Sequence, residues 1–242
     1  MLWDSKESAL RYDQWAKTPQ GAFALRQEEK LLQGVIAPWP RRKQKLVDIG
    51  CGTGLFLEFF WSCGFDLTGI DSSPAMLALA RDKIGHRADL HVGWAEHLPF
   101  EDREFDYAAL TTVLEFVDNP GEVLREAMRV VRKGIVLMFL NRFSMYGCSA
   151  RLFRKKTFLS RAHWFSWLEM RGLIQKNLSP GLIEARSILL GPPSTWNQAP
   201  VFRHVNSLPV FPWLGAVTAV RIDLTAPPAQ TPLMAWNTEP TV

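Results

Sequence analysis

The sequence has only three cysteines in 242 residues, and one of them lies inside a glycine-rich turn. Three thiols placed in this way provide neither a disulfide framework nor a cysteine metal cluster. The five histidines are scattered without the spacing of metal ligands, so we expect no metal site. No run approaches the ~18 consecutive apolar residues that a membrane span requires. The first residues lack a basic region followed by an apolar core, so we expect no signal peptide and a cytoplasmic protein.

Apolar residues make up 47% of the sequence, which is enough for one sizeable core at this length. No internal repeat is present. We therefore expect a single domain, 1–242, with an insertion.

One stretch combines a strand, a turn and a helix. A short apolar run, 46–49, contains Asp48 and breaks into three glycines at alternate positions, Gly50, Gly52 and Gly54. Residues 55–61 then read as a helix. Glycine suits a turn that needs unusual backbone angles and a close approach of ligand to backbone, and a helix N-terminus directs N–H groups at that ligand. This pattern predicts the start of a nucleotide-binding βαβ unit. A glycine-rich turn that binds no ligand could have the same sequence.

The glycine spacing differs from that of dinucleotide-binding proteins. Their G-x-G-x-x-G fingerprint would place the third glycine at position 55, where this chain has Leu55. The third glycine comes one residue earlier. A nucleotide-dependent oxidoreductase is therefore disfavoured.

A second acidic residue, Asp71, follows Gly50 by 21 positions and ends the predicted strand 66–71. A carboxylate about 20 residues after the turn is placed to accept hydrogen bonds from the two hydroxyls of an adenosine ribose. Its charge would also repel a 2′-phosphate. The alternative is that Asp71 only caps the next helix, but Ser72 or Ser73 could serve as that cap.

Three motifs together resemble those of the class I S-adenosylmethionine-dependent methyltransferases. Asp48 followed by Gly-x-Gly-x-Gly resembles their motif I. Residues 94–100, Trp-Ala-Glu-His-Leu-Pro-Phe, resemble a family stretch that reads Asp-Ala-Glu-x-Leu-Pro-Phe. Tyr12-Asp13-x-Trp15 followed by Thr18-Pro19-x-Gly21 is similar to the leader of the quinone-biosynthesis type enzymes. The resemblance covers most of the chain and is strongest from Leu46 to Pro120.

The resemblance implies S-adenosylmethionine as cofactor. The implied cofactor-binding residues are Asp48, Gly50, Cys51, Gly52, Thr53, Gly54, Asp71, Ser72, Met76, Ala95, Glu96, Thr111 and Tyr12. Tyr12 could instead be ordinary packing. Trp94 replaces the family's Asp, and because an indole cannot accept a hydrogen bond, adenine recognition would fall to the backbone near Ala95 and to Glu96.

No catalytic residue stands out. Phe116 stands where the family usually has a histidine, which removes the obvious titratable group near the methyl. His163 and His204 are weak candidates for a general base. The Asn-Pro-Pro-Tyr motif of enzymes that methylate nucleic-acid bases and protein amides is absent. In-line methyl transfer asks mainly for alignment and desolvation, so a named base is not required.

The resemblance implies an α/β fold: a Rossmann-like, seven-stranded, mostly parallel sheet with helices on both faces and an antiparallel last strand. N-terminal helices and a basic insertion would cap it. We expect an N-terminal helical cap (1–40), a cofactor-binding core (41–140), a basic and aromatic cap (141–176), last strands with a proline-rich loop (177–224) and a loose tail (225–242). Within these we expect a solvated linker at 38–43, a helix at 120–132 closed by Gly134, and a long loop at 191–213.

The positive charge is concentrated in one segment. Residues 141–176 contain eight basic residues and one acid, which gives +7 in a chain of net charge +4. The segment could be a solvated helix face, a lid whose arginines pair with an anionic acceptor, or a patch within 142–165 that makes transient contact with a membrane surface. Nucleic acid remains an alternative, although no nucleic-acid module is visible.

The sequence thus predicts an enzyme that methylates a small, lipophilic or acidic acceptor. A non-catalytic protein that retains the cofactor pocket is the alternative, favoured by Trp94 and Phe116. The sequence does not determine the oligomeric state or the methylated atom.

Overall fold

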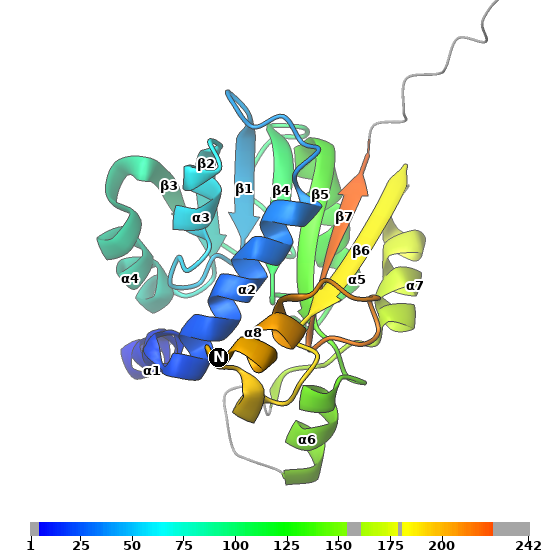
Figure 1. The fold of residues 1–242 in the computed structure, drawn as a ribbon. Coiled ribbons are helices and arrows are strands. Elements are labelled where there is room, and N and C mark those ends of the chain that lie inside the picture. Colours follow the sequence, from blue (N-terminus) through cyan, green and yellow to red (C-terminus); the bar gives the residue numbers. More distant parts are fainter. Residues whose placement is uncertain (1–4, 154–160, 179–180, 225–242) are drawn as a thin grey trace, which may run out of the picture.

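The computed structural model describes residues 5–153, 161–178 and 181–224. One seven-stranded sheet forms its centre, in the order β3-β2-β1-β4-β5-β7-β6 (Figure 1). The strands are β1 (Lys45–Ile49), β2 (Asp66–Asp71), β3 (Ala88–Val92), β4 (Phe105–Thr111), β5 (Val131–Leu140), β6 (Leu182–Ile188) and β7 (Val217–Asp223). Strands β1 to β5 pair in parallel, whereas β7 pairs antiparallel with both β5 and β6. The predicted α/β fold is confirmed, and β7 lies between β5 and β6.

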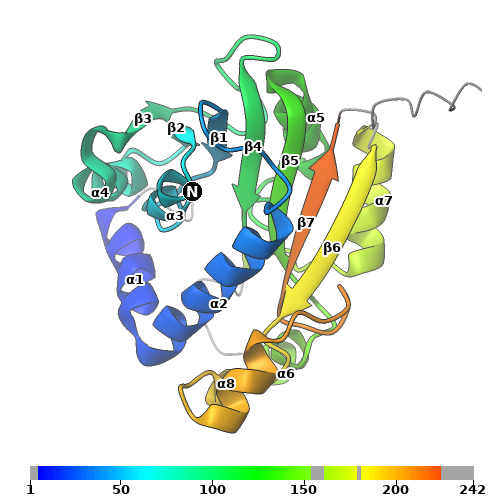
Figure 2. The same cartoon turned by 45° about the horizontal axis from the view of Figure 1, so that its top comes forward.

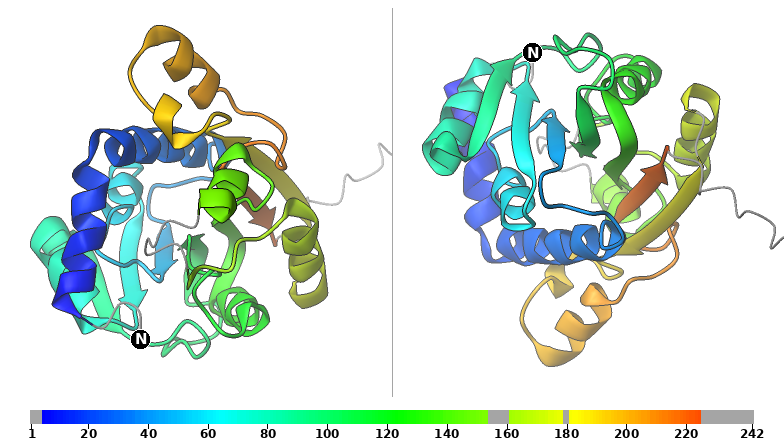
Figure 3. Two further views of the ribbon diagram at one scale, coloured as in Figure 1. Left: turned by 90° about the horizontal axis from the view of Figure 1, so that it is seen from below. Right: turned by 90° about the horizontal axis from the view of Figure 1, so that it is seen from above.

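Helices cover both faces of the sheet (Figure 3). They are α1 (Lys6–Lys17), α2 (Pro19–Val35), α3 (Leu57–Ser62), α4 (Pro74–Ile84), α5 (Pro120–Val130), α6 (Met145–Phe153), α7 (Trp167–Asn177) and α8 (Pro200–Ser207), with short 3-10 turns η1 (Gly85–Arg87) and η3 (Pro193–Thr195). Side chains of α2, α3 and α4 form the core on one face, and those of α5 and α7 form it on the other. Strands β1, β4 and β5 are buried on both faces, as expected for parallel strands between two helical layers.

Local capping signals set where several helices begin. The Thr18 side chain accepts a hydrogen bond from the Gly21 amide and Pro19 occupies the first turn of α2, so α1 ends where α2 begins. Asn119 caps α5 in the same way, again with a proline next to it. Ser166 and Glu169 form a reciprocal capping box at the start of α7.

Two expectations about secondary structure are wrong, one about where a helix ends and one about a segment expected to be a loop. Helix α5 ends at Val130 rather than at 132, because Val131 already pairs with Phe105 in the sheet. The segment 191–213, expected as a loop, contains η3 and α8. Pro200 occupies the first turn of α8, where its missing N–H is not needed.

The expected solvated linker at 38–43 contains a buried side chain, Trp39, which is 6% exposed. Its ring stacks on Tyr107 at 4.1 Å between centroids, and its Nε1 donates a hydrogen bond to Asp223 at 2.7 Å. Gly134 leaves room for this ring, because a Cβ atom there would lie 2.9 Å from it. Trp39 thus ties the chain before β1 to the far strand β7.

The parallel strands end on the side of the sheet where α1, α6 and α8 lie (Figures 1 and 2). Loops after the carboxyl ends of such strands are the usual place for a ligand site in an open α/β sheet. Among the described helices, none has the length and apolarity needed to cross a membrane. The predicted tail, 225–242, lies outside the described residues, as do Arg154, Lys155 and Lys156 of the basic segment.

Candidate cofactor and acceptor site

The glycine turn after β1 adopts backbone angles that glycine favours. The φ values are +71° at Gly50, +55° at Gly52 and +76° at Gly54. A Cβ atom at Gly50 would lie 2.6 Å from the Val113 side chain, so this glycine also allows close packing. A Cβ atom at Gly52 would meet no atom of the described residues within 4 Å. Gly52 therefore borders open space, where a ligand can approach the backbone.

Asp71, at the end of β2, is held against this turn. One carboxylate oxygen accepts a hydrogen bond from the Gly52 amide at 2.8 Å, and the other accepts one from the Ser73 amide at 2.8 Å. Burial raises the pKa of Asp71, and these two donors partly offset the rise. Each oxygen keeps a further lone pair for a ligand hydroxyl. Ser73, not Asp71, is the cap of α4, since its side chain accepts from the Met76 amide.

Asp48 is fully buried at the end of β1, and neither of its carboxylate oxygens has a hydrogen-bond partner among the described residues. Burial, with a smaller contribution from Asp71, raises the pKa of Asp48 to about 8. Buried polar atoms are normally paired, so this carboxyl is the clearest unsatisfied group near the turn.

A cluster of ion pairs holds helix α1 next to the glycine turn. Asp13 pairs with Lys83 of α4 and, at 3.0 Å, with Lys17. Lys83 also donates to the backbone oxygen of Thr53 at 2.9 Å. Burial raises the pKa of Asp13, but the two ammonium groups outweigh burial and hold it below its usual value. This cluster fixes α1, and with it Tyr12, over the cofactor turn.

Two adjoining cavities open at the carboxyl ends of the strands. The larger, about 730 Å³, has a size typical of small-molecule sites, and the smaller measures about 110 Å³. Both are lined by Gly50, Asp71, Thr112 and Phe116. The glycine turn and Asp71 therefore lie at the junction of the two cavities.

Most of the predicted cofactor residues line one of these cavities. Ser72, Ala95 and Glu96 line the larger, and Tyr12, Cys51, Gly52, Met76 and Thr111 line the smaller, while Gly50 and Asp71 line both. Asp48, Thr53 and Gly54 are absent from both linings. Of the two candidate bases, His163 lines the larger cavity, whereas His204 is exposed on α8 and lines neither.

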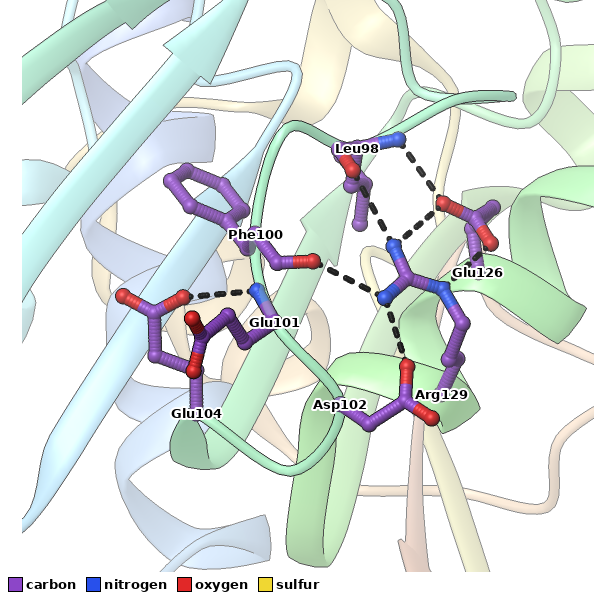
Figure 4. Close-up of polar contacts among 7 residues, drawn as sticks. All are labelled: Leu98, Phe100, Glu101, Asp102, Glu104, Glu126 and Arg129. Carbon is purple, nitrogen blue, oxygen red and sulfur yellow. Dashed lines mark hydrogen bonds and ion pairs between the residues drawn. The ribbon is translucent and has the colours of Figure 1, made fainter.

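The loop after β3, which carries Trp94 and Glu96 into the larger cavity, is fixed by one side chain of α5 (Figure 4). Arg129 donates to the backbone oxygens of Leu98 at 3.0 Å and Phe100 at 2.8 Å. It also pairs with Asp102 and Glu126, and Glu126 accepts from the Leu98 amide at 2.8 Å. Trp94 lines the larger cavity and is 49% exposed, so it does not fill the core.

The segment after β4 contributes strain and a buried acid. Thr112 has a φ of +58°, which is rare for a β-branched residue and is often found at functional sites. Glu115 is 2% exposed, and one of its oxygens accepts from the Leu140 amide at 2.7 Å while the other has no partner among the described residues. Burial raises its pKa to about 8.

Sequence reasoning missed Glu28, Tyr146 and Trp196, all of which line the smaller cavity. Glu28 had a readable signal. It lies on the apolar side of α2 with Leu25 and Leu32 at helical spacing, so it is an acid in a buried stripe. Trp196 had no such signal in the sequence, because it lies in a segment expected to be a loop.

Comparisons with known proteins agree on one family. Residues 47–139 match the model of the methyltransferase domain family. A ubiquinone biosynthesis O-methyltransferase of Azorhizobium caulinodans is 35% identical over 103 residues, which are 41% of each chain. The chain spans less than half the length of the first curated relatives that it matches.

Solved structures share the fold over nearly the whole chain. A SAM-dependent methyltransferase of Thermotoga maritima has a TM-score of 0.74 at 24% identity and covers 93% of this chain and 100% of its own. A magnesium protoporphyrin IX methyltransferase of Synechocystis, solved with bound SAH, has a TM-score of 0.67 at 11% identity, with coverage of 93% and 97%. At these identities the likeness concerns the fold.

Proposed function

Through residues 47–139 this chain belongs to the class I S-adenosylmethionine-dependent methyltransferases, and we propose that it transfers the cofactor's methyl group to a small acceptor. The observation that carries the proposal is the junction of Gly52 and Asp71. There an open glycine backbone, which lines the smaller cavity, lies beside a fixed carboxylate with free lone pairs, which lines both cavities.

The residues present fit S-adenosylmethionine. Asp71 would accept hydrogen bonds from the ribose hydroxyls, and the backbone of the glycine turn would lie against the methionine part. Asp48, whose oxygens have no partner among the described residues, would pair with the methionine ammonium group through this turn. Trp94 and Ala95 would border the adenine, with the exposed indole ring available for stacking.

When bound, the cofactor supplies a methyl group on a positively charged sulfur, ready for in-line displacement. The chain's contribution is alignment and exclusion of water. Helix α1, held by the Asp13–Lys83 ion pair, covers the turn from one side. The loop after β3, held by Arg129, lines the larger cavity. Any proton that the acceptor loses must go to a group within hydrogen-bond reach.

The sequence favours a lipophilic or an acidic acceptor. Tyr12, Trp15, Tyr146 and Trp196 line the smaller cavity and support a lipophilic one. For an acidic acceptor the described support is Arg161, which lines the larger cavity. The compact smaller cavity favours the reacting end of a small molecule over a protein or nucleic-acid chain.

Transient contact with a membrane surface through 142–165 stays a proposal. Phe143 is 65% exposed and Met145 is 55% exposed, and basic residues flank them. Aromatic and apolar side chains next to arginine and lysine suit an interface with anionic lipids. Sedimentation with vesicles of phosphatidylcholine, with and without phosphatidylserine, tests this. Binding to neither kind of vesicle would exclude the contact.

A cofactor-binding protein without catalysis is the second candidate. Phe116 in place of a histidine and Trp94 in place of an acid favour it. The test is release of S-adenosylhomocysteine from S-adenosylmethionine during incubation with a panel of amines, phenols and carboxylic acids. Methyl transfer to any member supports the enzyme. Tight cofactor binding without transfer to any of these classes would favour the binding protein.

A further inference from the structure

The smaller cavity is also lined by a carboxyl group that the proposed cofactor contacts do not use, Glu28. It projects from α2 and is 8% exposed. Among the described residues it has no hydrogen-bond or ion-pair partner, unlike the buried acids Asp13 and Asp106, which are paired with lysines. Burial, with a smaller effect of Glu29, raises the pKa of Glu28 to about 7. An unpaired buried acid destabilises a fold, so its presence calls for a ligand.

Four aromatic side chains line the same cavity as this carboxyl group. Tyr12 and Trp15 of α1 stack at 6.1 Å, and Tyr146 of α6 meets Trp196 edge-to-face at 5.1 Å. These four residues line the cavity together with Glu28. Burial raises the pKa of both Tyr12 and Tyr146, and the charge of Glu28 adds a smaller rise to each. Aromatic faces and a carboxylate both attract a cation.

The described residues of the same cavity offer no cationic side chain to an anion. Its described lining contains no lysine, arginine or histidine. Asp71, the other acidic residue of this described lining, adds negative potential. An anionic acceptor would therefore be repelled from the position next to the cofactor turn.

We propose that the smaller cavity binds a primary or secondary amine as the methyl acceptor, and that Glu28 both recognises its ammonium form and takes up its proton. This rests on the proposed function of the chain. The amine enters as R–NH3+ and transfers one proton to the Glu28 carboxylate, which becomes a carboxylic acid. The nitrogen lone pair of R–NH2 then forms the new N–C bond while the S–C bond breaks and its electron pair goes to sulfur. The products are R–NH2–CH3+ and the neutral thioether, and Glu28 later returns its proton to water.

The arrangement suits this exchange. A carboxyl group titrating near neutrality is ionised often enough to bind an ammonium and basic enough to take its proton. In a cavity lined by aromatic rings, the neutral pair of amine and carboxylic acid is less disfavoured than it is in water.

The test is a calorimetric titration of the full chain, saturated with S-adenosylhomocysteine, using three probes of one shape: benzylamine, benzyl alcohol and benzoate. We expect benzylamine to bind more tightly than the other two. In Glu28→Gln its affinity should fall by about 30-fold or more, since a buried charge pair loses one member. Glu29→Gln changes the neighbouring acid on α2, which does not line the cavity, and should leave the affinity within about twofold.

Several outcomes separate the possible failures. If the unmodified chain does not bind S-adenosylhomocysteine, the proposed function itself is refuted. Normal binding of the thioether, with benzoate or benzyl alcohol preferred over benzylamine, would refute the amine site alone. The three-probe comparison uses the unmodified chain, so it tests the amine site even if Glu28→Gln fails to fold. An equal loss in Glu28→Gln and Glu29→Gln would assign the effect to overall charge and overturn the role of Glu28.

Discussion

Arg129 joins the loop after β3 to helix α5, and its removal gives the sharpest prediction about stability. The guanidinium group donates to two backbone oxygens, at Leu98 and Phe100, and pairs with Asp102 and Glu126. Its side chain is 32% exposed, so solvent weakens these contacts without abolishing them. The carboxylates and the guanidinium hydrogen bonds together raise the pKa of Arg129 above its usual value.

We expect Arg129→Ala to lower the free energy of unfolding by about 2–3 kcal/mol. A hydrogen bond from a charged group contributes ~1.5–3 kcal/mol when shielded, and an exposed ion pair contributes ~0–1 kcal/mol. The two hydrogen bonds to backbone oxygens are of the charged, shielded kind, and their contribution is reduced because the side chain is partly exposed. The pair with Asp102 is an exposed ion pair. For a chain of this size the midpoint of thermal unfolding should fall by roughly 5–10 °C.

The matched control is Arg125→Ala, one turn earlier on the same helix. Arg125 is 51% exposed, pairs with Glu122 and donates a hydrogen bond to the Asn177 side chain, and it has no bond to a backbone oxygen of the described residues. Its loss should change stability by less than about 1 kcal/mol. Circular dichroism during heating and in urea measures both variants, and hydrogen exchange should show faster exchange at residues 94–100 only for Arg129→Ala. Equal destabilisation of the two variants would refute the role of Arg129 as an anchor of this loop.

Two further predictions concern the glycine turn. Gly50→Ala should lower the free energy of unfolding, measured by urea titration, by more than about 2 kcal/mol, because φ is +71° and the new methyl would lie 2.6 Å from Val113. The control is Gly34→Ala on α2, where a Cβ atom meets open space. In the same titration this variant should be neutral or slightly stabilising. Because the pKa of Asp48 is raised to about 8, the folded protein keeps a proton that the unfolded chain releases above pH ~4. Stability of the cofactor-free protein should therefore fall as pH rises from about 4 to about 8, and Asp48→Asn should remove part of that fall. A variant with an unchanged pH profile would contradict the buried, unpaired state of Asp48.

The parts of the fold that follow from local rules were predictable from the sequence. The strand, glycine turn and helix at 46–61, and Asp71 at the end of the next strand, follow from spacing and turn chemistry alone. The capping residues beside Pro19 and Pro120 mark helix starts in the same way.

Other parts depend on contacts between distant residues and could not be read locally. Trp39 looks solvated in its polar stretch, but it is buried because Gly134 and Tyr107, far away in sequence, leave a slot for its ring. Helix α8 forms in a proline-rich segment where a loop is the ordinary expectation. The cavity around Glu28 needs α1, α2, α6 and the loop before α8 to meet, and no spacing rule states that they do.

The central claim is that Asp71 and the glycine turn bind S-adenosylmethionine, and calorimetric titration with S-adenosylhomocysteine tests it most directly. The unmodified chain should bind the thioether and not NADH. Asp71→Ala should weaken binding roughly 10- to 100-fold, because a charged acceptor of two hydroxyl groups is lost. Asp66→Ala removes an exposed acid at the other end of the same strand and should leave binding unchanged. Binding of NADH in preference to the thioether, or equal binding by Asp71→Ala and the unmodified chain, would contradict the account.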